Sequence, residues 1–92
     1  MTIKVKFLAY FRDIFGERER EVRLAGGSRL RDLLKVLCTT AEREKYIFAE
    51  EEKLNPQTVI IMNGMPVESL GGLTAPLSDG DIIAIFPYLG GG

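Results

Sequence analysis

The chain has 92 residues, of which 46% are hydrophobic and 27% are charged, and its formal net charge is −1 at pH 7. This length suits one domain with a modest core, and the balanced charge gives no general attraction to nucleic acid or to anionic membranes. Histidine is absent and there is one cysteine, which excludes the usual zinc and copper ligand sets, Ser-His and Cys-His catalytic pairs, and an internal disulfide.

The sequence also limits which cellular location and which activity can be expected of the chain by itself. No apolar run approaches the roughly 20 residues that span a bilayer, and the sequence starts on a strand pattern instead of a signal peptide. We therefore expect a cytoplasmic protein with no membrane partner, in a reducing compartment. P-loop and Gly-x-Gly-x-x-Gly motifs are missing, so we expect a chain that is not catalytic by itself and binds no metal or cofactor.

Alternating apolar residues and lysines over residues 3–7 predict a half-buried first strand. Leu8 then places a large apolar side chain on the face of the lysines. It is either a strand end covered by a neighbouring segment or part of an exposed docking patch. Residues 12–16 predict a short turn of helix or a loop, which a glycine ends. The charged stretch 17–24 predicts a second strand, paired with the first at a sheet edge, and a glycine pair then turns the chain.

The clearest helical signal follows Ser28, which we expect to be the N-cap. Five residues at helical spacing form one apolar stripe: Leu30, Leu33, Leu34, Leu37 and Cys38. Because Cys38 lies on that stripe, we interpret it as a small core residue and not as a reactive thiol. Thr39 and Thr40 can end this helix and cap a second one.

Residues 41–54 are rich in charge and contain three large apolar anchors, Tyr46, Ile47 and Phe48. We expect a helix or an irregular segment with a mostly solvated face. The acidic triplet 50–52 is too short to indicate a metal or a basic partner. Asn55-Pro56 ends the segment with a turn.

The β-branched run 58–62 predicts a central strand. Asn63-Gly64 is a strong hairpin signal, so residues 65–68 should form a short return strand, which Pro66 confines to a sheet edge. We expect residues 69–74, which contain two glycines, to be a flexible loop.

The last strand is predicted at 82–86, after a tight polar turn over residues 78–81. Both of its faces are apolar, which favours a central position, and Pro87 ends it. Ile83 and Ile85 should face the helix, which leaves Ala84 and Phe86 on the opposite face.

This order of elements predicts an α+β fold, the ubiquitin-like β-grasp, in which a mixed sheet packs on one main helix. The first and last strands become parallel neighbours, because the helix supplies the long crossover that parallel pairing needs. We expect residues 1–87 to form this domain and residues 88–92 to be its flexible C-terminal tail.

Three joined features carry a family resemblance: Asp79-Gly80-Asp81, a strand ending in Phe86-Pro87, and a terminal Gly91-Gly92. Together they resemble the small subunit of molybdopterin synthase, within the sulfur carriers of molybdopterin and thiazole biosynthesis. The resemblance covers essentially the whole chain. The chain differs from that pattern at Tyr88, where a second proline is common, at Gly90, and in longer segments at 41–57 and 69–75.

The resemblance implies that the carboxylate of Gly92 is the reactive group. A ubiquitin-activating-like adenylyltransferase would use ATP to adenylate it, and a sulfur donor would convert it into a thiocarboxylate. The molybdopterin synthase large subunit would then pass the sulfur to a pterin precursor. Residues without Cβ, such as Gly91, can thread a narrow channel that any side chain would block. All catalytic groups would come from the partner enzymes.

Docking of such partners needs an apolar surface near the tail. We expect Leu8, Pro66 and Phe86 to form one patch on an exposed sheet face, at positions that match the partner-binding residues of the resembled family. The remaining expected partner contacts are in or next to the tail: Pro87, Tyr88, Leu89 and Gly90.

Terminal glycines do not distinguish between several functions. A ubiquitin-like modifier would be joined through Gly92 to lysines of target proteins. A carrier of the thiazole pathway is a third possibility, although such chains tend to lack the middle segment 41–57. The remaining alternative is a β-grasp interaction module whose terminal glycines carry no chemistry.

Overall fold

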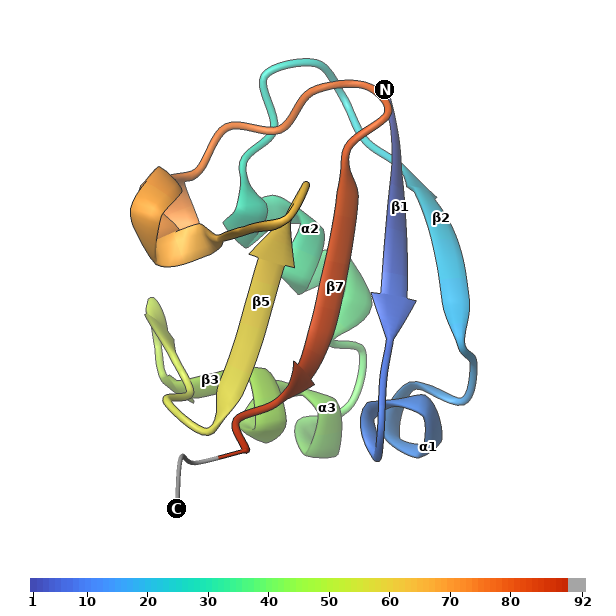
Figure 1. Cartoon of the computed structure of the whole chain (residues 1–92), viewed down its shortest axis with the longest axis vertical. Helices are drawn as coiled ribbons and strands as arrows, with labels where there is room; N and C mark the ends of the chain where they lie inside the picture. Colours follow the sequence, from blue (N-terminus) through green and yellow to red (C-terminus); the bar gives the residue numbers. More distant parts are fainter. Residues whose placement is uncertain (90–92) are drawn as a thin grey trace.

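The computed structural model describes residues 1–89 and shows one five-stranded mixed sheet with its helices on one side (Figure 1). The strands lie side by side in the order β2 (Glu19–Arg23), β1 (Thr2–Phe7), β7 (Ile82–Pro87), β5 (Thr58–Met62) and β6 (Met65–Pro66). β1 and β7 are parallel, and the other neighbours are antiparallel. The β-grasp prediction is therefore confirmed, with the last strand at the centre.

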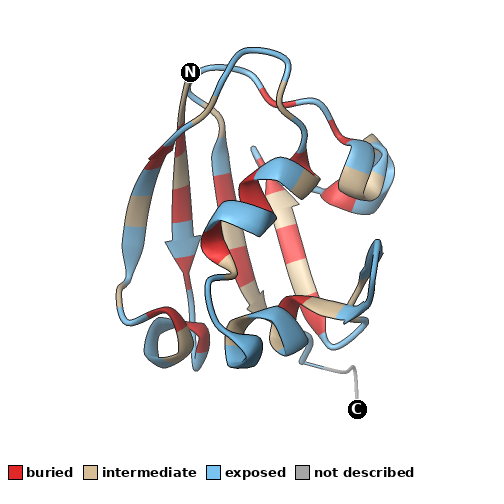
Figure 2. Cartoon of the chain, turned by 180° about the vertical axis from the view of Figure 1, so that it is seen from behind, coloured by how far each residue is buried: buried red, intermediate tan, exposed pale blue. Residues whose placement is uncertain are grey.

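The main helix α2 (Leu30–Leu37) crosses one face of this sheet (Figure 2). Its four leucines are fully buried, and they meet the inward side chains of the strands, among them Ile3, Val5, Ile83 and Ile85. Burial of such side chains from both layers supplies most of the stabilisation. No helix in residues 1–89 is long and apolar enough to cross a membrane.

Two short helices pack at the lower end of the sheet in Figure 1. α1 (Phe11–Phe15) ends at Gly16, whose φ of 74° is the left-handed conformation that glycine adopts without strain. α3 (Ala41–Ile47) starts after Thr40, whose side chain accepts a hydrogen bond from the Arg43 backbone N–H at 3.1 Å. Both predictions are confirmed.

The predicted start of the main helix is wrong by one residue. Arg29 is the N-cap, and the Asp32 carboxylate accepts a hydrogen bond from its backbone N–H at 2.8 Å. Ser28 is held outside the helix because its carbonyl accepts from the Leu77 N–H at 3.1 Å. At the other end, Cys38 is the half-buried C-cap instead of a fully buried member of the stripe.

Three further predictions need correction: the segment after α3, the length of the return strand, and the loop that follows this strand. After α3, the chain forms a small hairpin of β3 (Phe48–Glu50) and β4 (Lys53–Leu54), which the charge-rich sequence did not indicate. The return strand β6 is only two residues long because Val67 turns into the core. The segment expected to be a flexible loop contains two 3₁₀ helices, η1 (Val67–Leu70) and η2 (Gly72–Thr74). The Asn63-Gly64 turn is confirmed, with both residues at positive φ.

Candidate docking surface and chain end

The central strand β7 leads the chain toward its C-terminal end. Pro87 is the last strand residue, is buried, and pairs in register with Thr58. The Tyr88 N–H then donates to the Gln57 carbonyl at 2.8 Å, which extends the pairing by one step. The chain therefore leaves the domain in a defined direction, between β1 and β5 at the lower edge of the sheet.

Of the predicted tail residues 88–92, the structure describes Tyr88 and Leu89. The side chains of Tyr88 and Leu89 are 57% and 84% exposed, so both are accessible to a partner at the edge of the domain. Gly90, Gly91 and Gly92 lie outside the described residues.

The face of the sheet away from α2 carries an apolar surface, here called the open-face patch. It consists of Leu8, Val59, Ile61, Pro66, Ala84 and Phe86. Cross-strand register brings Val59 opposite Phe86, and Ile61 opposite both Ala84 and Pro66. Leu8 joins them because its N–H donates to the Ile85 carbonyl at 3.0 Å, which places it beside Phe86.

The predicted trio of Leu8, Pro66 and Phe86 thus lies on one sheet face. Leu8 is 37% exposed, which favours the docking interpretation over a covered strand end. Sequence reasoning missed Val59 and Ile61, because a β-branched run that is apolar on both faces is typical of a strand covered on both sides. No sequence signal marks them, since only the structure shows that Thr58, Ile60 and Met62 are on the buried side of β5.

A charged border flanks the open-face patch on the side of β1 and β2. Lys4 and Lys6 lie opposite Glu21 and Glu19, and the Lys4 Nζ is 3.9 Å from a Glu19 carboxylate oxygen. Exposed pairs of this kind contribute little to folding stability. Their position beside an apolar centre is the arrangement of a protein interface with a polar rim.

The cysteine supplies no chemistry. Burial, together with nearby Glu44, raises the pKa of the Cys38 thiol to about 11, although Arg43 partly opposes the shift. The thiol is therefore protonated at neutral pH and is a poor nucleophile. This agrees with its interpretation as a structural residue.

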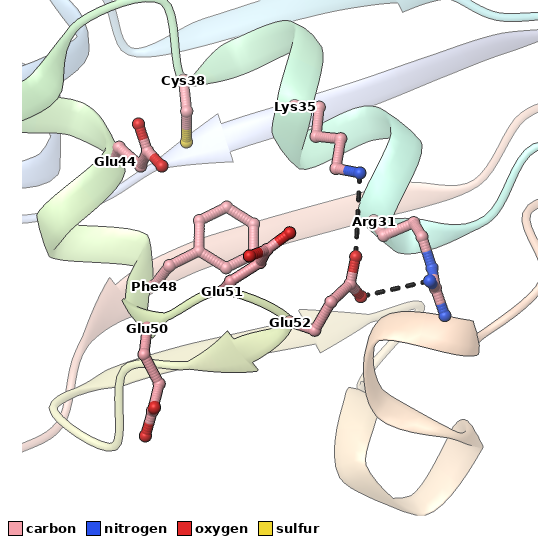
Figure 3. A pocket seen from close by; sticks show the side chains of 8 residues that line it. All are labelled: Arg31, Lys35, Cys38, Glu44, Phe48, Glu50, Glu51 and Glu52. Atoms are coloured by element: carbon pink, nitrogen blue, oxygen red, sulfur yellow. Dashed lines mark ion pairs between the residues drawn. The ribbon is translucent and has the colours of Figure 1, made fainter.

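Cys38 lines a pocket of about 390 Å³ on the helix side of the molecule (Figure 3). The pocket lies between α2, α3 and the β3–β4 hairpin. In Figure 3, the Glu52 carboxylate reaches two cations of α2, with Arg31 Nη1 at 3.1 Å and Lys35 Nζ at 3.7 Å. Within residues 1–89, no three Asp, Glu or Cys side chains are grouped so that they could hold a metal ion.

This geometry, a β-grasp whose central strand leads to Tyr88 and Leu89 beside an uncovered apolar sheet face, agrees with the comparisons to known proteins. The profile of the ThiS family matches residues 5–92. The chain belongs to the ThiS family. It is a ubiquitin-like protein of the sulfur-carrier and small-modifier class, which confirms the predicted sulfur-carrier resemblance.

Three relatives of this ThiS-family chain illustrate the range of the class. Small archaeal modifier protein 3 of Haloferax volcanii is 27% identical over the full length of both chains. The solution structure of small archaeal modifier protein 1 from Methanosarcina acetivorans is 31% identical, with a TM-score of 0.80 over 99% of this chain and 96% of the other. A candidate molybdopterin converting factor subunit 1 from Pyrococcus furiosus is 30% identical, with a TM-score of 0.75 over 97% and 99%.

Proposed function

We propose that this protein is the sulfur-carrying small subunit of a molybdopterin synthase and that Gly92 is its reactive residue. The observation that carries the proposal is the position of Tyr88, which follows the central strand β7 beside the open-face patch and leads the chain toward Gly92. The family match that extends through Gly92 and the likeness to a candidate molybdopterin converting factor subunit support it.

The proposed chemistry starts from an ionised α-carboxylate, which is a poor electrophile at pH 7. One of its oxygens attacks the α-phosphorus of ATP, pyrophosphate leaves, and an acyl-adenylate forms. A hydrosulfide equivalent from a sulfur donor then attacks the acyl carbon and displaces AMP, which leaves a thiocarboxylate on Gly92. The sulfur is finally transferred to a pterin precursor held by the large subunit, and water cleaves the bond between the sulfur and the acyl carbon, which restores the Gly92 carboxylate.

The chain's own part in this cycle is to present a substrate group. A cognate adenylyltransferase supplies the groups that stabilise the first transition state, and the large subunit supplies those of the last. Pro87, Tyr88 and the glycines position the carboxylate, while the open-face patch binds the partner. We place the cycle in the cytoplasm, where ATP and reduced sulfur donors are available.

Mass spectrometry of the intact chain tests this proposal directly. Incubation with ATP, the cognate adenylyltransferase and a sulfide source should replace one oxygen of Gly92 by sulfur, which is visible as the mass difference between these atoms. Gly92→Ala should block the gain because its Cβ lies next to the reacting carbon. Gly26→Ala is the matched control, since a Cβ at Gly26 meets nothing within 4 Å.

An unmodified wild-type terminus in the presence of active adenylyltransferase would contradict the proposed chemistry. A second assay decides the pathway: the thiocarboxylate form, mixed with the large subunit and the pterin precursor, should form the dithiolene. A thiocarboxylate that forms but transfers its sulfur only in thiazole synthesis would assign the chain to that pathway.

The second candidate function is protein modification, and it is favoured by the two small archaeal modifier proteins among the relatives. In this case the activated Gly92 carboxyl would be transferred to lysine amines of target proteins. Immunoblots of cell extract should then show a ladder of conjugates that disappears when Gly92 is deleted. A single unconjugated band would leave sulfur transfer as the function.

A further inference from the structure

An aromatic pair, with Tyr10 exposed and Tyr46 half-buried, lies at the lower edge of the domain, apart from the open-face patch. The rings of Tyr10 and Tyr46 are 5.6 Å apart, and Tyr10 is 42% exposed. The buried Phe11 packs against both, at 4.9 Å from Tyr10 and 6.1 Å from Tyr46, and joins the pair to the core. We call Tyr10 and Tyr46 the aromatic shelf.

The connections of the shelf place it at the end of β7. Tyr10 follows β1, and the Tyr46 carbonyl accepts a hydrogen bond from Thr58 Oγ1, the first residue of β5, at 2.6 Å. Since β7 lies between β1 and β5, the shelf spans the end of the strand from which the chain leaves. Figure 1 shows α1 and α3, the helices beside these residues, behind this end of the sheet.

The backbone before Tyr10 has an unusual conformation. Ala9 has a φ of 52°, in the left-handed region that disfavours residues with a Cβ. This turn at Ala9 directs the chain from β1 into α1, and the residues on either side of it, Leu8 and Tyr10, are exposed. Strain of this kind is often kept where it positions functional side chains.

We infer that the aromatic shelf is the contact site for the entrance of the enzyme that adenylates Gly92. The inference rests on the proposed function. Five residues from Tyr88 to Gly92 span at most about 18 Å even when fully extended, so an enzyme that reaches Gly92 must bring its entrance close to the edge of the domain.

The chemistry of the first step favours the adenylating enzyme over the sulfur-accepting subunit. An acyl-adenylate hydrolyses readily and has to be enclosed away from water, whereas a thiocarboxylate is less labile. An entrance that closes around the chain on all sides contacts Leu8 and Phe86 on the open face and the aromatic shelf behind it. Tyrosine suits such a position, because its ring packs on apolar groups while its hydroxyl remains hydrogen-bonded.

The test is the kinetics of ATP–pyrophosphate exchange by the cognate adenylyltransferase, with the carrier as the varied substrate. Tyr10→Gln should raise the KM for the carrier about tenfold with kcat unchanged, because it removes binding outside the reacting centre. Tyr10→Phe should recover most of the loss. Val36→Gln is the matched control: Val36 is 46% exposed on α2, away from the chain end, and its substitution should leave KM unchanged.

Thermal unfolding of each variant separates lost contacts from lost structure. A KM for Tyr10→Gln within twofold of wild type overturns the inference, and so does a variant that loses affinity only for the sulfur-accepting subunit. If wild type itself supports no exchange with an enzyme active on its own carrier, the proposed function fails first, and the two failures are therefore distinguishable.

Discussion

At the scale of single residues, Arg43 contributes more contacts that hold the fold together than its exposed neighbours do. The Arg43 guanidinium donates to the Ile14 carbonyl at 3.1 Å, to the Phe15 carbonyl at 3.2 Å and to Thr39 Oγ1 at 2.9 Å, and it lies over the Phe15 ring. The two carbonyls belong to the last turn of α1, which has no helical partners for them. Arg43 therefore joins α3 to α1 beside the aromatic shelf.

We predict that Arg43→Met lowers the free energy of unfolding by about 2 kcal/mol, because two carbonyls lose charge-assisted partners while the aliphatic stem is kept. Chemical denaturation measures this. Arg43→Lys should recover only part of the loss, since a single ammonium cannot bridge the same acceptors. Arg23→Met, an exposed position on the edge strand β2, is the control and should change stability little. Equal effects at both arginines would show that the α1–α3 connection is unimportant.

At the scale of elements, a local sequence pattern is sufficient to predict the structure wherever one residue type suits one backbone geometry. The Asn63-Gly64 turn is such a case, since both residues adopt positive φ and they connect β5 to β6 as predicted. The turn also holds β7, because the Asn63 side chain accepts from the Ile82 N–H at 2.9 Å and donates to Asp81 at 2.9 Å. A two-residue turn thus fixes the start of the central strand.

We predict that Gly64→Ala destabilises the fold by about 1 kcal/mol, because φ is 84° and a Cβ is strained there although it meets no neighbour. Gly26→Ala again serves as the control, since Gly26 lies outside the left-handed region and is equally open. Thermal melting of the two variants measures the difference. Equal melting temperatures would mean that the turn adjusts without cost.

Elements whose pattern suits two geometries were predicted less well. Residues 48–54 form a hairpin although three consecutive glutamates dominate the stretch, because Phe48 and Leu54 pack against the core and pair with each other. Likewise, the two 3₁₀ helices after β6 depend on burial of Val67 and Ala75 under α2 and the sheet, a long-range contact that local composition does not encode.

At the scale of the whole molecule, the sheet has one face covered by helices and one face left open. The parallel β1–β7 pair places the N-terminal end of β1 and the exit of the chain at opposite ends of the sheet. The open-face patch and the aromatic shelf then flank the exit from two sides. A partner that encloses the exit on all sides meets both surfaces, whereas one that packs only on the open face meets the patch alone.

We predict that Phe86→Thr weakens binding to the sulfur-accepting subunit about thirtyfold, because Phe86 lies between Leu8 and Val59 in the open-face patch and next to the exit. Threonine is β-branched and therefore suits a strand. Titration calorimetry measures the affinity, and circular dichroism checks the fold. Val36→Thr on the helix side provides the control, and unchanged affinity in the Phe86 variant would place the docking surface elsewhere.

The sequence by itself determined the fold class, the order of the main elements and the absence of histidine- or thiol-based chemistry, which together directed attention to the chain end. Those conclusions follow from periodicity and residue type, which are local. The sequence also predicted that Ile83 and Ile85 of β7 face the helix, which the structure confirms. Only the tertiary structure decided which face of β5 stays uncovered, that Arg29 caps α2, and that Tyr10 and Tyr46 meet across α1 and α3. These three features depend on contacts between residues far apart in the chain. When a strand is apolar on both faces, its sequence does not indicate which face a helix will cover.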